Sequence, residues 1–318
     1  MLLKSILGTN VQTKLWRFIT KLYMKNELRK KIIEIIRQRE TLRKLRRAKR
    51  LVKAPIRTFV YYVLASLSHI KPYKLTFSTL WGTKMTSYLP EGNTFYYYGY
   101  CEANLTNFLL RFLKEGDVVL DVGAHVGFYS MLASALVGEK GSVHSFEPTP
   151  WTYEILKQNT EKLSNVTLNS NAVSDKKEEI SFKDYGHGYG AYNTAHKDGS
   201  TLKKKSKTVT VETIVLDDYC KERSIRPDFI KLDAEGYEYA ILQGMKSILE
   251  DERPIVTLEV AGGEGWAENC KKSINLLLSK KYKPYEMSLD GFISPHIIKK
   301  NYEYDNLLFI PEEKNITL

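Results

Sequence analysis

Short apolar segments alternate with amphipathic segments along the second half of the chain. Runs rich in Val, Ile and Leu are typical of buried strands, whereas apolar positions three or four residues apart are typical of helices. The predicted strands cover residues 118–122, 142–146, 166–170, 228–232 and 254–260, and the predicted helices cover 128–136, 152–163, 237–249 and 266–280. Nearly continuous apolar strands separated by helices form a mostly parallel sheet with helices on both faces. We therefore predict an α/β, Rossmann-like fold.

Three segments depart from this alternation. Residues 181–219 separate the third and fourth strands, and we expect an inserted hairpin or lid there. Residues 76–89 and 94–99 are rich in β-forming residues on either side of a Glu-Gly-Asn turn, which predicts an antiparallel pair. The segment 304–310 is expected to close the sheet in the antiparallel direction.

The first 57 residues predict a basic helical extension. They contain no Gly or Pro between Asn10 and Ala54, and they are rich in good helix formers. Apolar residues form a stripe on this otherwise cationic helix: Ile32, Ile33, Ile35, Ile36, Leu42, Leu45 and Leu51. Such a helix can lie on an anionic membrane, bind RNA, pack on a partner, or remain a solvated or oligomerising arm. We divide the chain into this extension (1–57), a helical and β-stranded lead-in (58–114) and an α/β domain (115–318).

The net charge of +11 is unevenly distributed. Residues 1–57 hold 18 Lys and Arg and three Glu, a net charge of +15, which leaves −4 for the rest of the chain. A basic surface for nucleic acid is therefore not expected on the main fold. Peripheral contact of residues 1–57 with an anionic membrane is the interpretation that we retain, and the oligomeric state stays open.

The cysteines and the apolar runs bear on the compartment. Cys101, Cys220 and Cys270 show neither a pairing pattern nor CxxC spacing, which argues against a disulfide scaffold and a structural zinc site. No apolar run reaches the roughly 18 residues that span a bilayer, and the opening residues lack the pattern of a signal peptide. We expect a cytoplasmic protein, peripheral to a membrane at most.

The first predicted strand ends in a glycine-containing turn, DVGAHVG. Gly123 permits a tight turn, and Gly127 lets the following helix pack against the sheet. His125 takes the position at which a dinucleotide-binding loop has its phosphate-clearing glycine. Backbone amides and the Asp121 carboxylate therefore suit an adenosine that carries a cationic group better than one that carries a phosphate.

The next two strand ends supply further candidates for cofactor binding. Glu147 ends the second strand, where a carboxylate can accept hydrogen bonds from both ribose hydroxyls. Asn171 and Ala172 follow the third strand and are expected to face an adenine edge. Together with the turn, these residues predict an S-adenosylmethionine site at the carboxyl edge of the sheet.

The fourth strand carries the candidate catalytic groups. Lys231 and Asp233 are two residues apart and share a face of that strand, and Glu235 follows in the loop. We assign Asp233 as the base that removes a proton from a hydroxyl, with Lys231 tuning it or positioning the hydroxyl. Glu235 and Glu238 are expected to orient substrate or cofactor, and Glu259 is a second possible partner for Lys231. No ligand spacing calls for a metal ion.

These segments resemble one known family. DVGAHVGFYS (121–130), FEP (146–148), NAVSD (171–175), TIVLDDY (213–219), DFIKLDAEGYE (228–238) and PIVTLE (254–259) are similar to the FkbM family of methyltransferases. The resemblance covers about residues 91–281, and KLDAEGYE is its most specific part. It implies a class I methyltransferase sheet with S-adenosylmethionine as cofactor, and O-methylation of a sugar, glycan or similar hydroxyl compound.

Two alternative functions remain open from the sequence. One is an RNA 2′-O-methyltransferase whose basic arm holds the RNA backbone. The other is a non-catalytic membrane-surface scaffold that keeps the methyltransferase fold. The tyrosine-rich insertion offers Tyr185, His187, Tyr189 and Tyr192 as candidates for stacking on a sugar, with an ordinary surface loop as the alternative.

Overall fold

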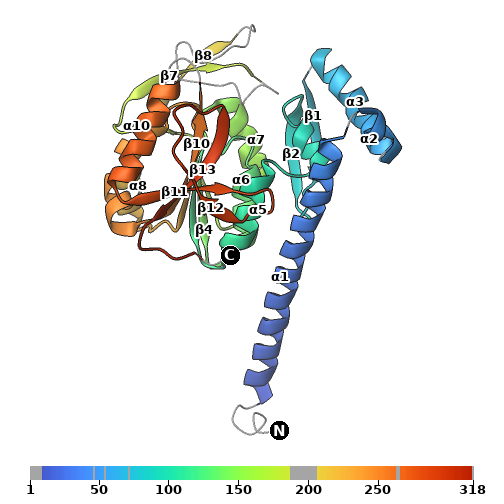
Figure 1. Ribbon diagram of the computed structural model, residues 1–318, viewed down its shortest axis with the longest axis horizontal. Coiled ribbons are helices and arrows are strands. Elements are labelled where there is room, and N and C mark those ends of the chain that lie inside the picture. The colour runs from blue at the N-terminus through green and yellow to red at the C-terminus, as the bar shows by residue number, and fades with distance from the viewer. Residues whose placement is uncertain are drawn as a thin grey trace.

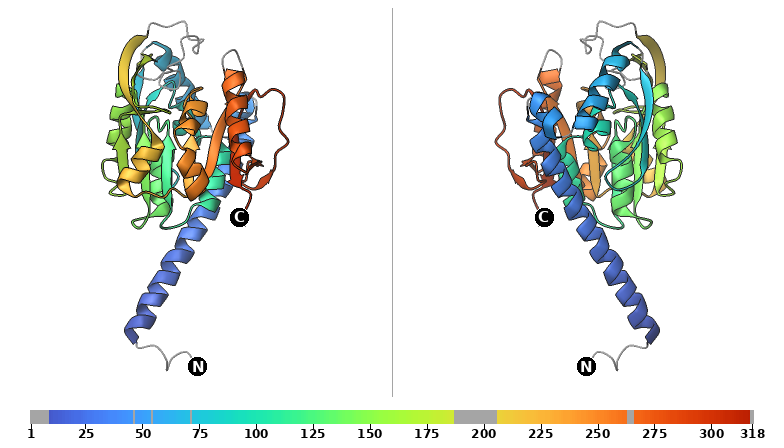
Figure 2. Two further views of the ribbon diagram at one scale, coloured as in Figure 1. Left: turned by 90° about the vertical axis from the view of Figure 1, so that its left-hand side faces the viewer. Right: turned by 90° about the vertical axis from the view of Figure 1, so that its right-hand side faces the viewer.

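The computed structural model describes residues 9–45, 47–53, 55–70, 72–186, 206–262 and 266–316 (Figure 1). An α/β body carries a lead-in of helices and a hairpin on one side, and the long helix α1 (Thr9–Arg43) runs along that side. The first half of α1 extends well beyond the body (Figure 2).

The central sheet has eight strands in the order β12-β11-β13-β10-β9-β3-β4-β5. Its parallel part consists of β3 (Val118–Val122), β4 (Ser142–Phe146), β5 (Val166–Asn169), β9 (Phe229–Leu232) and β10 (Ile255–Ala261). Its antiparallel part consists of β11 (Tyr282–Met287), β12 (Ile293–Pro295) and β13 (Tyr304–Pro311). The predicted closing strand is confirmed, since β13 pairs antiparallel with β10. The chain crosses from β5 over to β9, so β3 lies between β4 and β9, and the strand order reverses there.

Helices cover both faces of this sheet, as predicted. One face carries α5 (Ala103–Phe112), α6 (Phe128–Val137) and α7 (Pro150–Thr160), and the other carries α8 (Leu216–Arg223), α9 (Glu238–Gln243) and α10 (Trp266–Ser279). Alternate strand residues enter the two cores, as the period of two requires. Val119 packs in the core of α5 and α6, and its neighbour Leu120 packs in the core of α8 and α9.

The insertion between β5 and β9 contains the expected hairpin. The strands β7 (Glu179–Asp184) and β8 (Lys207–Ile214) pair antiparallel, and β8 also pairs with β6 (Ala172–Val173). Tyr185 is buried beside β7 and does not lie on the surface. The candidate stacking residues His187, Tyr189 and Tyr192 lie outside the described residues.

Two sequence predictions about local structure are wrong. Residues 94–99 form a helix, α4 (Asn93–Tyr98), and the antiparallel pair is instead β1 (Tyr73–Ser78) with β2 (Lys84–Leu89). Phe95, Tyr97 and Tyr98 are buried, so packing outweighs the β propensity of an aromatic run. Gly99, with φ +78°, ends the helix.

The single helix expected over residues 237–249 is divided after α9. The second part contains the π-helical segment η3 (Ile248–Glu252). Gly244 lies at the break, where a Cβ atom would be 2.3 Å from the carbonyl oxygen of Ser174. This close approach to the loop after β6 has no counterpart in the helical pattern of the sequence.

The second half of α1 is packed on the body. Ile32, Ile33 and Ile36 are buried in the core that includes α5. The Arg29 guanidinium donates hydrogen bonds to the carbonyl oxygens of Leu110, Leu113 and Leu136, which end α5 and α6. The apolar stripe of the basic extension is therefore covered by the chain itself in this part.

Two shorter helices connect α1 to the hairpin. They are α2 (Arg47–Lys53) and α3 (Pro55–Ile70), and α3 packs near α4 and β2. Among the helices of the described residues, none combines the length and the apolar character that crossing a bilayer requires.

Candidate active site

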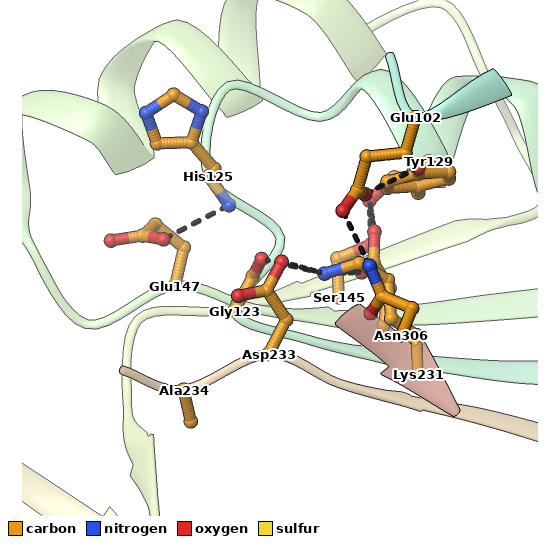
Figure 3. Close-up of polar contacts among 12 residues, drawn as sticks. Glu102, Gly123, His125, Tyr129, Ser145, Glu147, Lys231, Asp233, Ala234 and Asn306 are labelled. Carbon is orange, nitrogen blue, oxygen red and sulfur yellow. Dashed lines mark hydrogen bonds and ion pairs between the residues drawn. The ribbon is translucent and has the colours of Figure 1, made fainter. Parts of the chain in front are cut away.

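The glycine-containing turn joins the carboxyl ends of β3 and β4. The backbone N–H groups of Gly123 and Ala124 both donate to the carbonyl oxygen of Phe146, at 3.0 Å each. The N–H of His125 donates to Glu147 Oε2 at 3.0 Å (Figure 3). The carboxylate of Glu147 thus lies directly against the turn, which is where a ribose-binding acid must lie.

Gly123 and Gly127 serve the roles expected of them. Both have positive φ, +75° and +90°. A Cβ atom on Gly123 would lie 1.7 Å from the carbonyl oxygen of Asp233, so the turn presses directly on the end of β9. A Cβ atom on Gly127 would lie 2.6 Å from a methyl group of Leu156 on α7. These contacts require glycine for close approach as well as for turn conformation.

Asp121 is buried at the end of β3 and only partly satisfied. Its Oδ2 accepts a 2.6 Å hydrogen bond from Ser130, which in turn accepts one from Ser145. Its Oδ1 is buried and has no hydrogen-bond partner among the described residues. Lys231 Nζ lies 3.8 Å from that oxygen, beyond hydrogen-bond distance. A ligand that carries an N–H group and a positive charge would satisfy it.

Lys231 and Asp233 form the ion pair predicted from their spacing. Lys231 Nζ donates to Asp233 Oδ2 at 2.8 Å and lies 3.4 Å from the carbonyl oxygen of Gly123. The side chain of Lys231 is 4% exposed, whereas that of Asp233 is 28% exposed. Asp233 is therefore the member of the pair that an acceptor from solvent can reach.

The charges of this pair are fixed by their surroundings. Burial alone would lower the pKa of Lys231, but the carboxylates of Asp233 and Asp121 raise it above its usual range. Burial alone would raise the pKa of Asp233, but Lys231 lowers it. Lys231 is therefore an ammonium group at neutral pH, and Asp233 is a carboxylate. The raised pKa of Lys231 disfavours a neutral lysine base, and its positioning or tuning role stays a prediction.

Glu259 is buried near the negative charge of Asp233. Burial, and after it the negative charge of Asp233, raises the pKa of Glu259 well above its usual range. The negative charge of Asp233 therefore favours the neutral form of Glu259.

Glu238 and Glu235 have different surroundings. Glu238 Oε1 accepts hydrogen bonds from the N–H groups of Ala234, at 2.8 Å, and Gly236, at 3.3 Å. Glu238 therefore holds its own loop through this oxygen, and the role of both residues in orienting a ligand stays a prediction. Glu235 has φ +51°, and burial together with Asp233 raises its pKa to about 8.

Several residues of the site were not predicted from the sequence. The Glu102 carboxylate accepts a 2.7 Å hydrogen bond from Tyr129 OH and another from the side-chain amide of Asn306. Figure 3 shows these three side chains beside Lys231. Glu102 comes from the start of α5, Tyr129 from α6 and Asn306 from β13. These contacts join segments far apart in the chain, so no local pattern indicates them.

His125 is held from the lead-in. Its Nε2 lies 2.5 Å from the carboxylate of Glu91, between β2 and α4. Burial alone would lower the pKa of His125, but Glu91 raises it to about 9. The ring points away from the Lys231–Asp233 pair (Figure 3). The side chain of His125 therefore anchors the turn to the lead-in, and the backbone N–H of His125 holds the Glu147 carboxylate.

Asn171 and Ala172 lie past the end of β5. Asn171 is half-buried, and Ala172 is buried at the start of β6. Their contact with an adenine edge stays a prediction.

Fold and site together define a class of protein. A Rossmann-like sheet has a glycine turn at the end of β3, an acid at the end of β4, and a charged pair at the end of β9, all at the carboxyl edge. The residues fit S-adenosylmethionine, because the unpartnered Asp121 oxygen accepts a cationic N–H and Glu147 lies where the ribose is expected. This is the arrangement of a class I methyltransferase.

Comparison with known families shows which family within that class the chain belongs to. Residues 121–287 match the methyltransferase FkbM domain, and the chain belongs to that family. The predicted family and the α/β fold class are thereby confirmed.

A curated relative and two solved structures are similar to parts of the chain. The hexuronic acid methyltransferase AglP of Haloferax volcanii is 26% identical over 164 residues, which cover 51% of this chain and 63% of that protein. The chain thus spans less than two thirds of that relative's length. A methyltransferase FkbM from Methylobacillus flagellatus has 17% identity and a TM-score of 0.42, over 69% of this chain and 54% of the other. A putative rRNA-methylase from Clostridium thermocellum has 16% identity and a TM-score of 0.42, over 68% and 99%.

Proposed function

We propose that this protein transfers the methyl group of S-adenosylmethionine to a hydroxyl group of a sugar, with a hexuronic acid or a glycan that contains one as the acceptor class. Membership of the FkbM family supports the methyl donor. The similarity to a hexuronic acid methyltransferase supports a sugar acceptor. Methyl transfer to oxygen also agrees with a site that holds a carboxylate within reach of solvent.

The bound cofactor supplies an electrophilic methyl group, and the residues of the chain do the rest. Glu147 would accept hydrogen bonds from the ribose hydroxyls, and Asp121 would accept one from the amino group of the methionine part. The glycine turn, held by Glu147 and Phe146, would fix the position of the adenosine. In-line displacement requires the acceptor oxygen to be held in line with the methyl group, and such positioning supplies much of the rate.

Asp233 is the base in this proposal. The acceptor hydroxyl donates a hydrogen bond to the Asp233 carboxylate, and its proton passes to that carboxylate as the new carbon–oxygen bond forms. S-adenosylmethionine, when bound, would release its methyl group with the electron pair of the broken carbon–sulfur bond left on sulfur, so no further reactant is needed. Lys231 holds the carboxylate in place through a 2.8 Å hydrogen bond to its Oδ2.

The observation that carries this proposal is the exposure of the pair at the end of β9. The ammonium group is enclosed, whereas the carboxylate reaches solvent beside the glycine turn. A structural ion pair has no need of this asymmetry, whereas a base must meet its substrate.

The test is methyl transfer by the full chain to oligosaccharides that end in a hexuronic acid. Mass spectrometry of the products should show the addition of one CH2, and calorimetry should show binding of S-adenosylmethionine. Asp233→Asn is the matched control that should bind cofactor without transfer. Absence of cofactor binding by the native chain would leave a scaffold role and refute the proposal. Cofactor binding with transfer to neutral sugars only would refute the hexuronic acid part.

A further inference from the structure

Helix α3 presents an apolar stripe to solvent. Four large apolar side chains recur at intervals of three or four residues, which places them on one face of the helix. They are Ile56 (79% exposed), Phe59 (65%), Val63 (40%) and Leu67 (51%). Val52, at 83% exposed, lies close by on α2. Single exposed apolar residues are ordinary on a protein surface, but an aligned set of large ones marks an interaction site.

The opposite face of α3 is already used for packing. Thr58 is buried and shares a 2.8 Å hydrogen bond with Tyr97 OH. The ring of Tyr61 lies 4.6 Å from that of Tyr97 on α4. The helix is therefore fixed on the body by one face, and the exposed stripe is not required to hold it there.

The segment of the chain that carries the stripe is basic. Residues 41–90 contain eleven Lys and Arg and no Asp or Glu. Lys44, Lys49 and Lys53 are exposed at the end of α1 and on α2. Lysine side chains bury their aliphatic stems and keep the ammonium group at a polar boundary. An apolar stripe bordered by such residues has the composition of a helix that lies in the interface of an anionic membrane.

We propose that the exposed face of α3, together with the lysines of α2 and the end of α1, binds the surface of an anionic lipid bilayer. Acyl chains accept the stripe, and anionic headgroups accept the lysines. A second copy of the chain is a poorer occupant, because joining two such faces would bring like charges together. RNA would accept the lysines but would leave the aliphatic side chains in water.

The location of this surface also connects it to the active site. Helix α3 packs against α4 and β2, and Glu91 between those two elements holds His125 in the cofactor turn. In Figure 1, α3 and the β7–β8 hairpin that follows β6 both lie at the upper end of the molecule. Resting on the proposed function, this arrangement favours an acceptor presented at a membrane surface, such as a lipid-linked sugar.

The experiment is co-sedimentation of the full chain with vesicles, without cofactor or acceptor. Vesicles of phosphatidylcholine alone are compared with vesicles that also contain phosphatidylglycerol. The native chain should bind the anionic vesicles, and raised salt should weaken the binding. Ile56→Ser with Phe59→Ser should reduce the affinity about tenfold or more, because two inserted side chains are lost. Lys49→Gln with Lys53→Gln should reduce it by roughly tenfold and remove most of the preference for anionic lipid.

The matched control changes isoleucines on another part of the surface. Ile297 and Ile298, 87% and 43% exposed, lie between β12 and β13. Ile297→Ser with Ile298→Ser should leave vesicle binding unchanged. Equal loss in this control would overturn the assignment to α3, as would failure of the native chain to bind anionic vesicles.

Two other outcomes would assign the surface to a different partner. If the native chain is a dimer in sedimentation velocity and Ile56→Ser with Phe59→Ser dissociates it, the stripe serves self-association instead. Salt-sensitive binding of a single-stranded RNA that displaces the chain from vesicles would assign the lysines to RNA.

Because vesicle binding is measured without methyl transfer, it tests the surface independently of the reaction. A chain that methylates soluble sugars but ignores vesicles refutes the surface alone. A chain that binds vesicles but transfers no methyl group to any sugar refutes the proposed function alone.

Discussion

The carboxyl edge of the sheet and the basic N-terminal helices handle their charged and apolar groups in opposite ways. At the sheet edge, Lys231 is enclosed among carboxyl groups that neutralise it. At the end of α1 and on α2, Lys44, Lys49 and Lys53 lie in solvent, and the sequence has no acidic residue between Glu40 and Glu91. The N-terminal helices also differ from one another in the burial of their apolar side chains, since Ile36 on α1 is fully buried and Ile56 on α3 is 79% exposed. Burial fixes charge and geometry for chemistry at the first region, whereas exposure at the second leaves a surface for a partner.

The largest expected effect is at the sheet edge. Asp233→Asn removes the proton acceptor but keeps the size of the side chain, so methyl transfer should fall by about 10²–10⁴-fold. Affinity for S-adenosylmethionine should stay nearly unchanged in calorimetry, because the cofactor contacts are assigned to Asp121 and Glu147. Transfer at the native rate would remove Asp233 from the role of base.

The contrast between the two helices can be measured with one substitution made at two positions. Ile36→Ala should lower the free energy of unfolding by about 2–4 kcal/mol, since it leaves a cavity under α1. Ile56→Ala should change it by about 0.5 kcal/mol or less, because the side chain is already in water. Urea denaturation of both variants gives the comparison. Equal losses would mean that the stripe of α3 is covered in solution.

The next effect concerns cofactor binding. Glu147→Ala should weaken the binding of S-adenosylmethionine about 10- to 100-fold, the usual worth of hydrogen bonds to a charged group. Calorimetry measures this directly, and circular dichroism should show that the fold remains. Glu147→Gln keeps one accepting oxygen, so its affinity for S-adenosylmethionine should lie between those of the native chain and the alanine variant. Native affinity in the alanine variant would place the ribose elsewhere.

The smallest expected effect is a change in pH dependence. Glu235 has a pKa raised from 4.5 to about 8 by burial and by Asp233, so the folded state holds this proton more tightly than the unfolded state does. Its contribution to stability is complete below pH 4.5 and is lost as the pH rises towards 8. Glu235→Gln should therefore lose less stability than the native chain between pH 5 and about 8 in denaturation experiments. Parallel curves for the two proteins would contradict the raised pKa.

The same variant separates two possible bases. If Asp233 is the base, the rate of transfer should not rise with a midpoint near pH 8, because Asp233 is ionised well below that pH. A rate that rises through a pKa of about 8, and loses that rise in Glu235→Gln, would move the base to Glu235.

Much of the fold and part of the site follow from sequence alone. The strands that become β3, β4, β5, β9 and β10 are nearly continuous apolar runs, and this pattern specifies a sheet buried on both faces. Because these strands are parallel, their carboxyl ends share one edge, which brings Asp121, Glu147 and Asp233 together without any knowledge of side-chain packing. Gly123 and Gly127 occur where the backbone needs them.

Tertiary structure decided what covers each face and which distant group meets each charge. An apolar stripe in the sequence states that a helix face is apolar, but the stripes of α1 and α3 look alike, and only packing buries one and exposes the other. The partners Glu91, Glu102 and Asn306 come from segments far along the chain, so no local spacing indicates them. Residues 93–98 became helical because burial of their aromatic rings outweighs local preference. Periodicity along a chain records the chemistry of each face, whereas the identity of the neighbour is a property of the folded molecule.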